Sequence, residues 1–176
     1  YNESWRALED IYADGQAKSI GVCNFNVERM TDLLDHAKIK PAINQIEISP
    51  WFQQTNDVKF FQGRDVAVEA WAQFANGKHD IFNNKVLKEI AENHHKTVGQ
   101  VILRWLTQKS IVVIPKAVHD EHQKENINIF DFKLTQDEMA KIKELDKGES
   151  QFFDHRDPAA IDNIFGESLK QLRDSE

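Results

Sequence analysis

Short runs of apolar and β-branched residues alternate along this chain with longer stretches of helical periodicity. The runs cover residues 19–25, 42–48, 66–74 and 111–116. Each run is almost continuously apolar, which is typical of strands that are covered on both faces. Strands that alternate with helices predict a parallel sheet with right-handed crossovers, and therefore an α/β fold. The side chains predicted to form its inner core are Ile20, Val22, Ile46, Ile48, Val66, Val68, Val112 and Ile114.

Apolar residues recur at helical spacing between these runs. The strongest such pattern covers residues 97–108, where the apolar positions share one helical face. Thr97 with Gln100 forms a capping-box signature at its start, and Thr135 with Glu138 forms a second signature further on. Three other helical faces are predicted from Trp5, Leu8, Ile11 and Tyr12, from Met30, Leu33, Leu34 and Ala37, and from Val86, Leu87, Ile90 and Ala91.

The pattern alone fits two architectures, a doubly wound sheet or part of a (β/α)8 barrel. Four strands do not close a barrel, and a four-strand piece would expose two apolar sheet edges. If this is barrel sequence, we therefore expect about half of the barrel to lie outside it. The chain starts at Tyr1, directly before a helical pattern, so we expect an upstream segment that was removed or is not included. Residues 146–176 are predicted to form a C-terminal tail on the substrate side.

Composition narrows the classes of protein that this chain can belong to. It has 40% hydrophobic and 29% charged residues, as an ordinary soluble domain has. With 22 basic and 29 acidic residues and no basic run, nucleic acid and membrane are poor partners. The single cysteine, Cys23, cannot form an internal disulfide and favours a reducing cytoplasm. No Cys/His group has zinc spacing, so no metal is expected, and His94 and His95 are expected to be solvated at a helix end.

Polar and aromatic residues lie at the ends of the predicted strands, where parallel βα folds place their sites. Asn24 can bind an amide-bearing ligand, or it can be a turn or N-cap residue of the next helix. Asn44 and Gln45 alternate, so one faces the helices and the other faces the opposite side. Gln45 can contact a ligand, or it can be a core polar group whose hydrogen bonds are satisfied within the protein. Trp71 offers a flat face to a planar ring, or it packs in the core.

Lys116 precedes a predicted helix at the end of the fourth run. A lysine beside a helix N-terminus makes an anion site for which phosphate is the natural ligand. A surface lysine that only packs its stem on the protein is the alternative. His119 and His122 lie one helical turn apart, but no third ligand completes a metal motif.

Taken together, these segments resemble the motifs of the aldo-keto reductase family. Residues 21–25 (Gly-Val-Cys-Asn-Phe) resemble its G-V-S-N-F motif, and residues 44–47 with Pro50 resemble N-Q-x-E-x-x-P. Residues 69–72 stand where the family has A-(Y/W)-S-P-L. The later matching segments are 100–105, 114–116 and 125–126, and residues 5–9 resemble the helix before the fifth barrel strand. The resemblance covers nearly the whole chain and is greatest to bacterial diketogluconate and methylglyoxal reductases.

The resemblance implies the C-terminal part of a (β/α)8 TIM barrel, strands five to eight with their helices, over residues 1–176. It also implies reduction of a small aldehyde or ketone with NADPH, and this chain would supply most of the cofactor site. Asn24 and Gln45 would hold the nicotinamide carboxamide beside Cys23, and Trp71 would stack on the nicotinamide ring. The other implied residues are Ala72, Phe74 and Asn76 on the pyrophosphate path, Lys116, Ala117, Val118, His122, Glu125 and Asn126 around the 2′-phosphate and adenine, and Trp51, Phe152 and Phe153 at the substrate pocket.

The sequence departs from the family pattern at both ends of this implied site. The family's catalytic Asp, Tyr, Lys and His match no residue here, so the resemblance implies that they precede Tyr1. Ala117 replaces a serine and His122 replaces an arginine, which removes a hydroxyl and a fixed positive charge from the 2′-phosphate site. We therefore expect a weaker preference for NADPH, and use of NADH as well.

Three hypotheses follow from the sequence. The first is an active NAD(P)H-dependent carbonyl reductase, a monomer or weak homodimer at full length. The second is a non-catalytic half-barrel that binds nucleotide or a partner, and the third is a divergent family member without turnover. If the 176 residues were the entire protein, it would need a complementing half or self-association, and a stable monomer in size-exclusion chromatography would contradict this.

Overall fold

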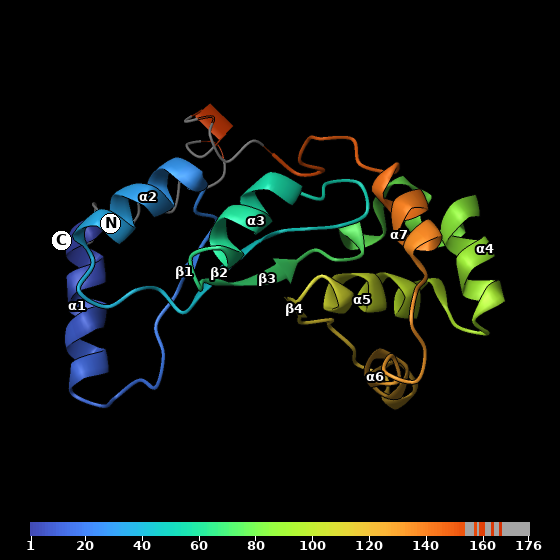
Figure 1. The fold of residues 1–176 in the computed structure, drawn as a ribbon, viewed down its shortest axis with the longest axis horizontal. Helices are drawn as coiled ribbons and strands as arrows, with labels where there is room; N and C mark the ends of the chain where they lie inside the picture. Colours follow the sequence, from blue (N-terminus) through green and yellow to red (C-terminus); the bar gives the residue numbers. More distant parts are fainter. Residues whose placement is uncertain (154–156, 158, 161–162, 164–165, 167–176) are drawn as a thin grey trace.

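A parallel sheet with its covering helices makes up the protein (Figure 1). The computed structural model describes residues 1–153, 157, 159–160, 163 and 166. The strands are β1 (Val22–Cys23), β2 (Ile43–Glu47), β3 (Ala67–Trp71) and β4 (Ile111–Val113). The helices are α1 (Asn2–Ala13), α2 (Val27–His36), α3 (Thr55–Gln62), the irregular 3-10 segment η1 (Ala75–Asn83), α4 (Lys85–Asn93), α5 (Val98–Gln108), α6 (Asp120–Ile127) and α7 (Gln136–Lys143). The strands follow chain order and every neighbouring pair is parallel, so the α/β prediction is confirmed.

All four predicted strands are present, but each is shorter than its apolar run. Backbone hydrogen bonds continue the β1–β2 ladder beyond β1, from Ala42 N to Ile20 O and from Asn24 N to Gln45 O, both 2.8 Å. β3 ends at Trp71 because Ala72 has a left-handed φ of 53°, which turns the chain out of the sheet.

One face of the sheet forms the main hydrophobic core. Val68 and Ile111 are partners in the β3–β4 register, and both are buried together with Ile46. Phe61 of α3 and Trp105 of α5 pack into the same core. Figure 1 shows α3 beside β2 and β3, with α5 following along the sheet towards β4. The prediction that Ile20, Ile46, Ile48, Val66 and Val68 belong to the core is confirmed, and Val22 is partly buried.

The opposite face of the sheet is partly open. Cys23, Gln45, Glu69 and Val112 follow one another across it in register. Val112 is 43% exposed and Ile114 is 49% exposed. The prediction that these two residues belong to the core was therefore wrong, because α3 and α5 cover the other face.

The helices begin largely where the sequence predicts. Both capping boxes are present, at Thr97 with Gln100 and at Thr135 with Glu138. The prediction that His94 is solvated was wrong, because α7 packs against α4 and brings Glu138 to 3.0 Å from its Nε2 atom. The side chain of His94 is only 19% exposed, whereas His95 is exposed.

The first part of the predicted tail packs against the loop that follows β2. Lys147 N donates to Trp51 O at 2.8 Å, and Gln53 N donates to the Asp146 carboxylate at 3.2 Å. The parts of the tail at 154–156, 158, 161–162, 164–165 and 167–176 lie outside the described residues. Among the described residues, no helix has the length and apolar character needed to cross a membrane.

Candidate functional site

Asn24 and Trp71 meet above the C-terminal ends of β1 and β3. Asn24 follows β1 with a left-handed φ of 54°, and its Oδ1 atom accepts a hydrogen bond from Trp71 Nε1 at 2.8 Å. Asn26, not Asn24, caps α2, since its Oδ1 accepts from Arg29 N at 2.9 Å. The N-cap alternative for Asn24 was therefore wrong, whereas the turn alternative agrees with its left-handed φ. Trp71 is partly exposed and packs on the ring of Phe152.

Side chains alternate between the two faces of β2, so the amide of Asn44 lies in the core and the amide of Gln45 lies on the open face. Asn44 is fully buried and pairs with the backbone of Phe25, through Nδ2 to O at 2.9 Å and Oδ1 from N at 3.4 Å. Gln45 lies on the open face, where its Nε2 donates to Glu69 Oε1 at 2.5 Å. The sequence reading did not single out Glu69, although a carboxylate in the middle of an apolar strand is the signal that could have identified it.

These contacts leave two complementary groups unused among the described residues. No hydrogen bond links Asn24 Nδ2, a donor, or Gln45 Oε1, an acceptor, to any residue that the structure describes. Trp71 holds the oxygen of Asn24, and Glu69 holds the nitrogen of Gln45, so the two free ends have fixed chemical character. A planar carboxamide offers the matching acceptor and donor. The pair can therefore recognise a primary amide.

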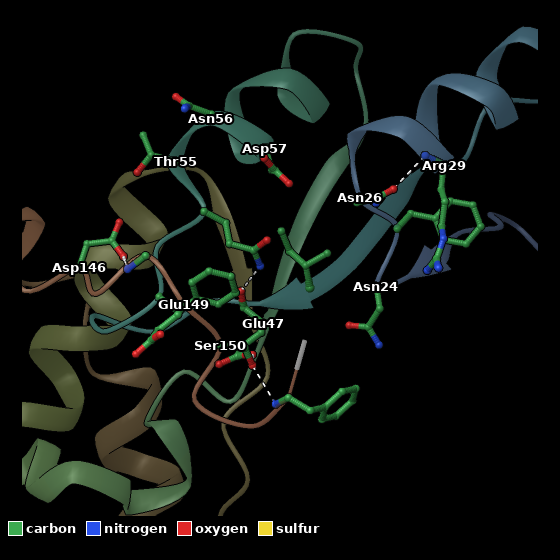
Figure 2. A pocket seen from close by; sticks show the side chains of 16 residues that line it. Asn24, Asn26, Arg29, Glu47, Thr55, Asn56, Asp57, Asp146, Glu149 and Ser150 are labelled. Carbon is green, nitrogen blue, oxygen red and sulfur yellow. Dashed lines mark hydrogen bonds between the residues drawn. The ribbon is translucent and has the colours of Figure 1, made fainter. Parts of the chain in front are cut away.

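A cavity of about 650 Å³ opens beside Asn24 (Figure 2). Asn24 from the end of β1, Glu47 from the end of β2 and Ser150 from the tail line it together. The remaining lining residues are Phe25, Asn26, Arg29, Ile46, Phe52, Gln54, Thr55, Asn56, Asp57, Asp146, Gly148, Glu149 and Phe153. Four carboxylates and one guanidinium therefore face this space, and its charge is predominantly negative.

Glu47 is the buried carboxylate of this cavity. Its side chain is 2% exposed and accepts hydrogen bonds from Ser150 Oγ at 2.5 Å and Gln151 N at 3.0 Å. Burial raises the pKa of Glu47, and the hydrogen bonds from Ser150 and Gln151 and the charge of Lys78 offset only part of that rise. The predicted pocket residues Phe152 and Phe153 follow directly, and Phe152 packs on Trp71 with ring centroids 5.2 Å apart.

The loop after Trp71 carries the predicted pyrophosphate residues. Ala72 and Asn76 have left-handed φ values of 53° and 51°, and Asn76 is exposed. Phe74 packs on Phe82 with ring centroids 5.6 Å apart. The structure thus places this loop beyond the strand end that carries Trp71.

The predicted phosphate end lies at the start of α6. Lys116 is exposed and Val118 is 74% exposed, while Ala117 is partly buried. His122 Nδ1 lies 3.3 Å from Glu125 Oε2, so a carboxylate of the site already engages this imidazole. Asp120 and Glu121 occupy the first turn of α6 and stabilise its N-terminus, but they oppose a phosphate there.

Adenine recognition was predicted at Glu125 and Asn126, which are both partly buried. Gln100 of α5 fixes the end of α6, because its Nε2 donates to Glu125 O at 3.1 Å and Asn128 O at 3.0 Å. The cap of α5 and the position of the predicted adenine residues are therefore coupled.

Trp51 lies away from the cavity. Trp51 is 5% exposed, packs in the main core and does not line the cavity, whereas its neighbour Phe52 does. Its placement gives no support to the predicted role in a substrate pocket. The described part of the chain contains no cluster of His, Cys, Asp or Glu that could hold a metal ion.

Both the sequence and the structure match known proteins. A family model described as "Aldo/keto reductase family" matches residues 1–147. Aldose reductase B of Dictyostelium discoideum is 46% identical over 144 residues, which cover 81% of this chain and 46% of that protein. Glyoxal reductase of Bacillus subtilis is 44% identical over 149 residues, covering 85% of this chain and 53% of its own length.

Solved structures agree with the sequence matches. A Bombyx mori aldo-keto reductase in complex with NADP has a TM-score of 0.82 at 34% identity, covering 88% of this chain and 53% of that one. An aldo-keto reductase from a Medee basin deep-sea metagenome has a TM-score of 0.83 at 34% identity, covering 87% and 57%. The chain spans about half the length of the curated relatives it matches.

Proposed function

Because the chain belongs to the aldo/keto reductase family, we propose that the full protein reduces small aldehydes or ketones with a nicotinamide dinucleotide. This chain would supply most of the cofactor site, as part of a (β/α)8 barrel. Relatives named glyoxal reductase and methylglyoxal reductase suggest a small dicarbonyl as substrate. Nothing in the comparisons favours the non-catalytic alternative.

The observation that carries the proposal is the pair of oriented amides at Asn24 and Gln45. Their free donor and acceptor match the carboxamide of a nicotinamide, and the indole of Trp71 lies beside them. When bound, a reduced nicotinamide dinucleotide supplies a hydride to a carbonyl carbon. Asn24 and Gln45 would orient the carboxamide, and Trp71 would offer an apolar face to the ring.

The phosphate end supports use of both cofactors. Neighbours solved with NADP and NADPH favour NADP(H). Lys116 would supply positive charge to a 2′-phosphate, but His122 is already paired with Glu125, and Asp120 and Glu121 lie on the same helix turn. The proposal is therefore NADP(H) with NAD(H) also accepted.

The group that protonates the carbonyl oxygen is not assigned within this chain. The prediction that the catalytic Asp, Tyr, Lys and His precede Tyr1 is kept as part of the proposal. The proposal also includes a cytoplasmic location, inferred from the single exposed Cys23, and a monomer or weak homodimer as the oligomeric state.

A kinetic experiment on the full-length protein tests the proposal. Purified protein is given methylglyoxal with NADPH or NADH, and the loss of reduced-nicotinamide absorbance is followed. We expect carbonyl-dependent oxidation, and Asn24→Ala should raise the cofactor KM about tenfold by the loss of a polar contact. Asn93→Ala, which changes an exposed residue at the end of α4, is the matched control and should leave KM unchanged. Absence of turnover with a panel of aldehydes and ketones and either cofactor would refute the proposal.

A further inference from the structure

A short segment of the tail is held against the candidate site by side chains that the proposed chemistry does not use. This segment, residues 148–153, lies more than one hundred residues after β2 in the chain, with a sequence separation of 103 between Ser150 and Glu47. It carries Phe152, which packs on Trp71, and Phe153, which lines the cavity beside Asn24. Whatever holds this segment therefore decides whether two aromatic rings stand at the site.

Glu47 is the main anchor of segment 148–153. One carboxylate oxygen accepts from Ser150 Oγ at 2.5 Å, and the other accepts from Gln151 N at 3.0 Å. Ser150 Oγ in turn accepts from Phe152 N and Phe153 N, both at 3.1 Å. The carboxylate thus fixes the hydroxyl, and the hydroxyl fixes the backbone of both phenylalanines. Figure 2 shows Glu47 and Ser150 facing each other at the cavity wall.

Lys78 holds the same segment from the loop after β3. Its Nζ atom donates to Gln151 O at 3.1 Å and lies 4.2 Å from the centroid of the Phe152 ring. A cation over an aromatic face attracts the ring and fixes its position. Segment 148–153 is thus held from the end of β2 and from the loop after β3 at once.

Burying a carboxylate such as that of Glu47 costs free energy unless hydrogen bonds or an opposite charge compensate for the lost hydration. Glu47 is 2% exposed, and a buried charge that serves packing alone is better replaced by an apolar or neutral group. A neutral glutamine of the same shape has a single side-chain acceptor, whereas Glu47 uses both oxygens at the same time. The carboxylate is therefore matched to holding Ser150 and Gln151 together.

We propose that Glu47 is a positioning residue that holds segment 148–153 over Trp71 and thereby sets how tightly the carbonyl substrate is bound. The effect on substrate rests on the proposed function, whereas the anchoring itself does not. Glu47 would act through Ser150 on Phe152 and Phe153, without contacting the reacting atoms. Loss of the anchor should release the segment, raise the KM for the carbonyl and change kcat much less.

The test combines hydrogen exchange with kinetics on the full-length protein. Glu47→Ala, Glu47→Gln and Lys78→Met are compared with Glu92→Ala and Glu92→Gln. The Glu92 variants are the matched controls because that side chain is exposed on α4 and lies outside both segment 148–153 and the cavity. Exchange is measured by mass spectrometry, without cofactor, in a peptide that covers 147–153 and in a reference peptide from α5.

We expect exchange of the 147–153 peptide to quicken about tenfold in Glu47→Ala and less in Glu47→Gln, which keeps one acceptor, while the α5 peptide stays unchanged. The KM for methylglyoxal should rise about fivefold to tenfold in the same order, with kcat within about twofold. Lys78→Met should raise both the exchange rate of the 147–153 peptide and the KM for methylglyoxal by smaller factors. If Glu47→Ala does not fold, the Lys78→Met variant tests the anchoring instead.

Two results would overturn the proposal. Exchange in the Glu47 and Lys78 variants equal to that in the Glu92 controls would show that these residues do not anchor the segment. Faster exchange with an unchanged KM would show that the segment does not govern substrate binding. A wild type without carbonyl-reductase activity would instead refute the proposed function and, with it, the substrate role, while the exchange data would still decide the anchoring.

Discussion

Gly21 lies where β1 and β2 approach each other so closely that no side chain fits. A Cβ atom at this position would lie 2.5 Å from Ile43 Cγ2 and 2.7 Å from Ile43 O. The methyl group could move by a rotamer change, but the carbonyl oxygen belongs to the β2 ladder and cannot. Gly21→Ala must therefore push β1 away from β2, and with it Asn24, three positions further on.

Overpacking of this kind costs about 1–3 kcal/mol. Taking about 2 kcal/mol, and about 2–4 °C per kcal/mol for a protein of this size class, Gly21→Ala should lower Tm by about 4–8 °C. The displaced Asn24 should also raise the KM for the cofactor. Thermal unfolding followed by circular dichroism, together with cofactor kinetics, measures both effects.

Gly99 is the matched control for this substitution. It lies in the first turn of α5, where the nearest atoms to a new Cβ are 3.7–3.9 Å away, an ordinary contact distance. Gly99→Ala should therefore raise stability by up to about 1 kcal/mol, because alanine loses less backbone entropy in a helix. A Tm for Gly21→Ala equal to that of the wild type would refute the steric reasoning and the β1–β2 register on which it depends.

Three further substitutions test the His94–Glu138 pair, the contacts of Asn44 and the phosphate end of the site. Burial opposes ionisation of Glu138, but hydrogen bonds from His94 and Thr135 hold the pKa of Glu138 below its ordinary value of 4.5. The ionised carboxylate therefore stabilises the fold above about pH 4.5, and this stabilisation is lost as the pH falls through the lowered pKa of the folded state. Glu138→Gln should therefore lower the free energy of unfolding by about 1–2 kcal/mol at pH 7, and urea titrations should show this difference shrinking below pH 4.5; a constant difference would contradict the assignment. Asn44→Leu should cost about 1–3 kcal/mol in the same titration, because it leaves the partly buried backbone N–H and C=O groups of Phe25 without their hydrogen-bond partner, and a loss below about 0.5 kcal/mol would count against it. His122→Arg should raise the ratio of kcat/KM for NADPH over NADH about tenfold, since arginine restores a fixed charge and a bidentate phosphate donor; an unchanged ratio would remove His122 from the site.

The sequence predicts the order and type of elements well because those depend on local periodicity. Capping at Thr97 and Thr135 depends on residues three positions apart, and both capping boxes formed as expected. Strand lengths were overestimated because an apolar run does not reveal where the backbone turns left-handed, as it does at Ala72.

The errors and omissions concern contacts between segments distant in the chain. His94 looked solvated because nothing near it in sequence pairs with it, but Glu138 lies 44 residues away. Val112 and Ile114 looked like core residues because an apolar run does not show which sheet face the helices leave open. Glu69 and Glu47 were missed as site residues for the same reason, since their partners come from another strand and from the tail.

In the proposed site, Asn24 and Gln45 bind the carboxamide of the nicotinamide, with Gln45 Oε1 as the acceptor for its N–H groups. Fluorescence titration of the full-length protein tests this assignment by comparing the Kd of NADPH with that of its acetylpyridine analogue, in which a methyl group replaces the amide nitrogen. The wild type should bind the analogue about fivefold to tenfold more weakly, and Gln45→Leu should bind both ligands equally, because the lost contact is the one that distinguishes them. A Gln45→Leu variant that still prefers the carboxamide by the wild-type factor would contradict this assignment.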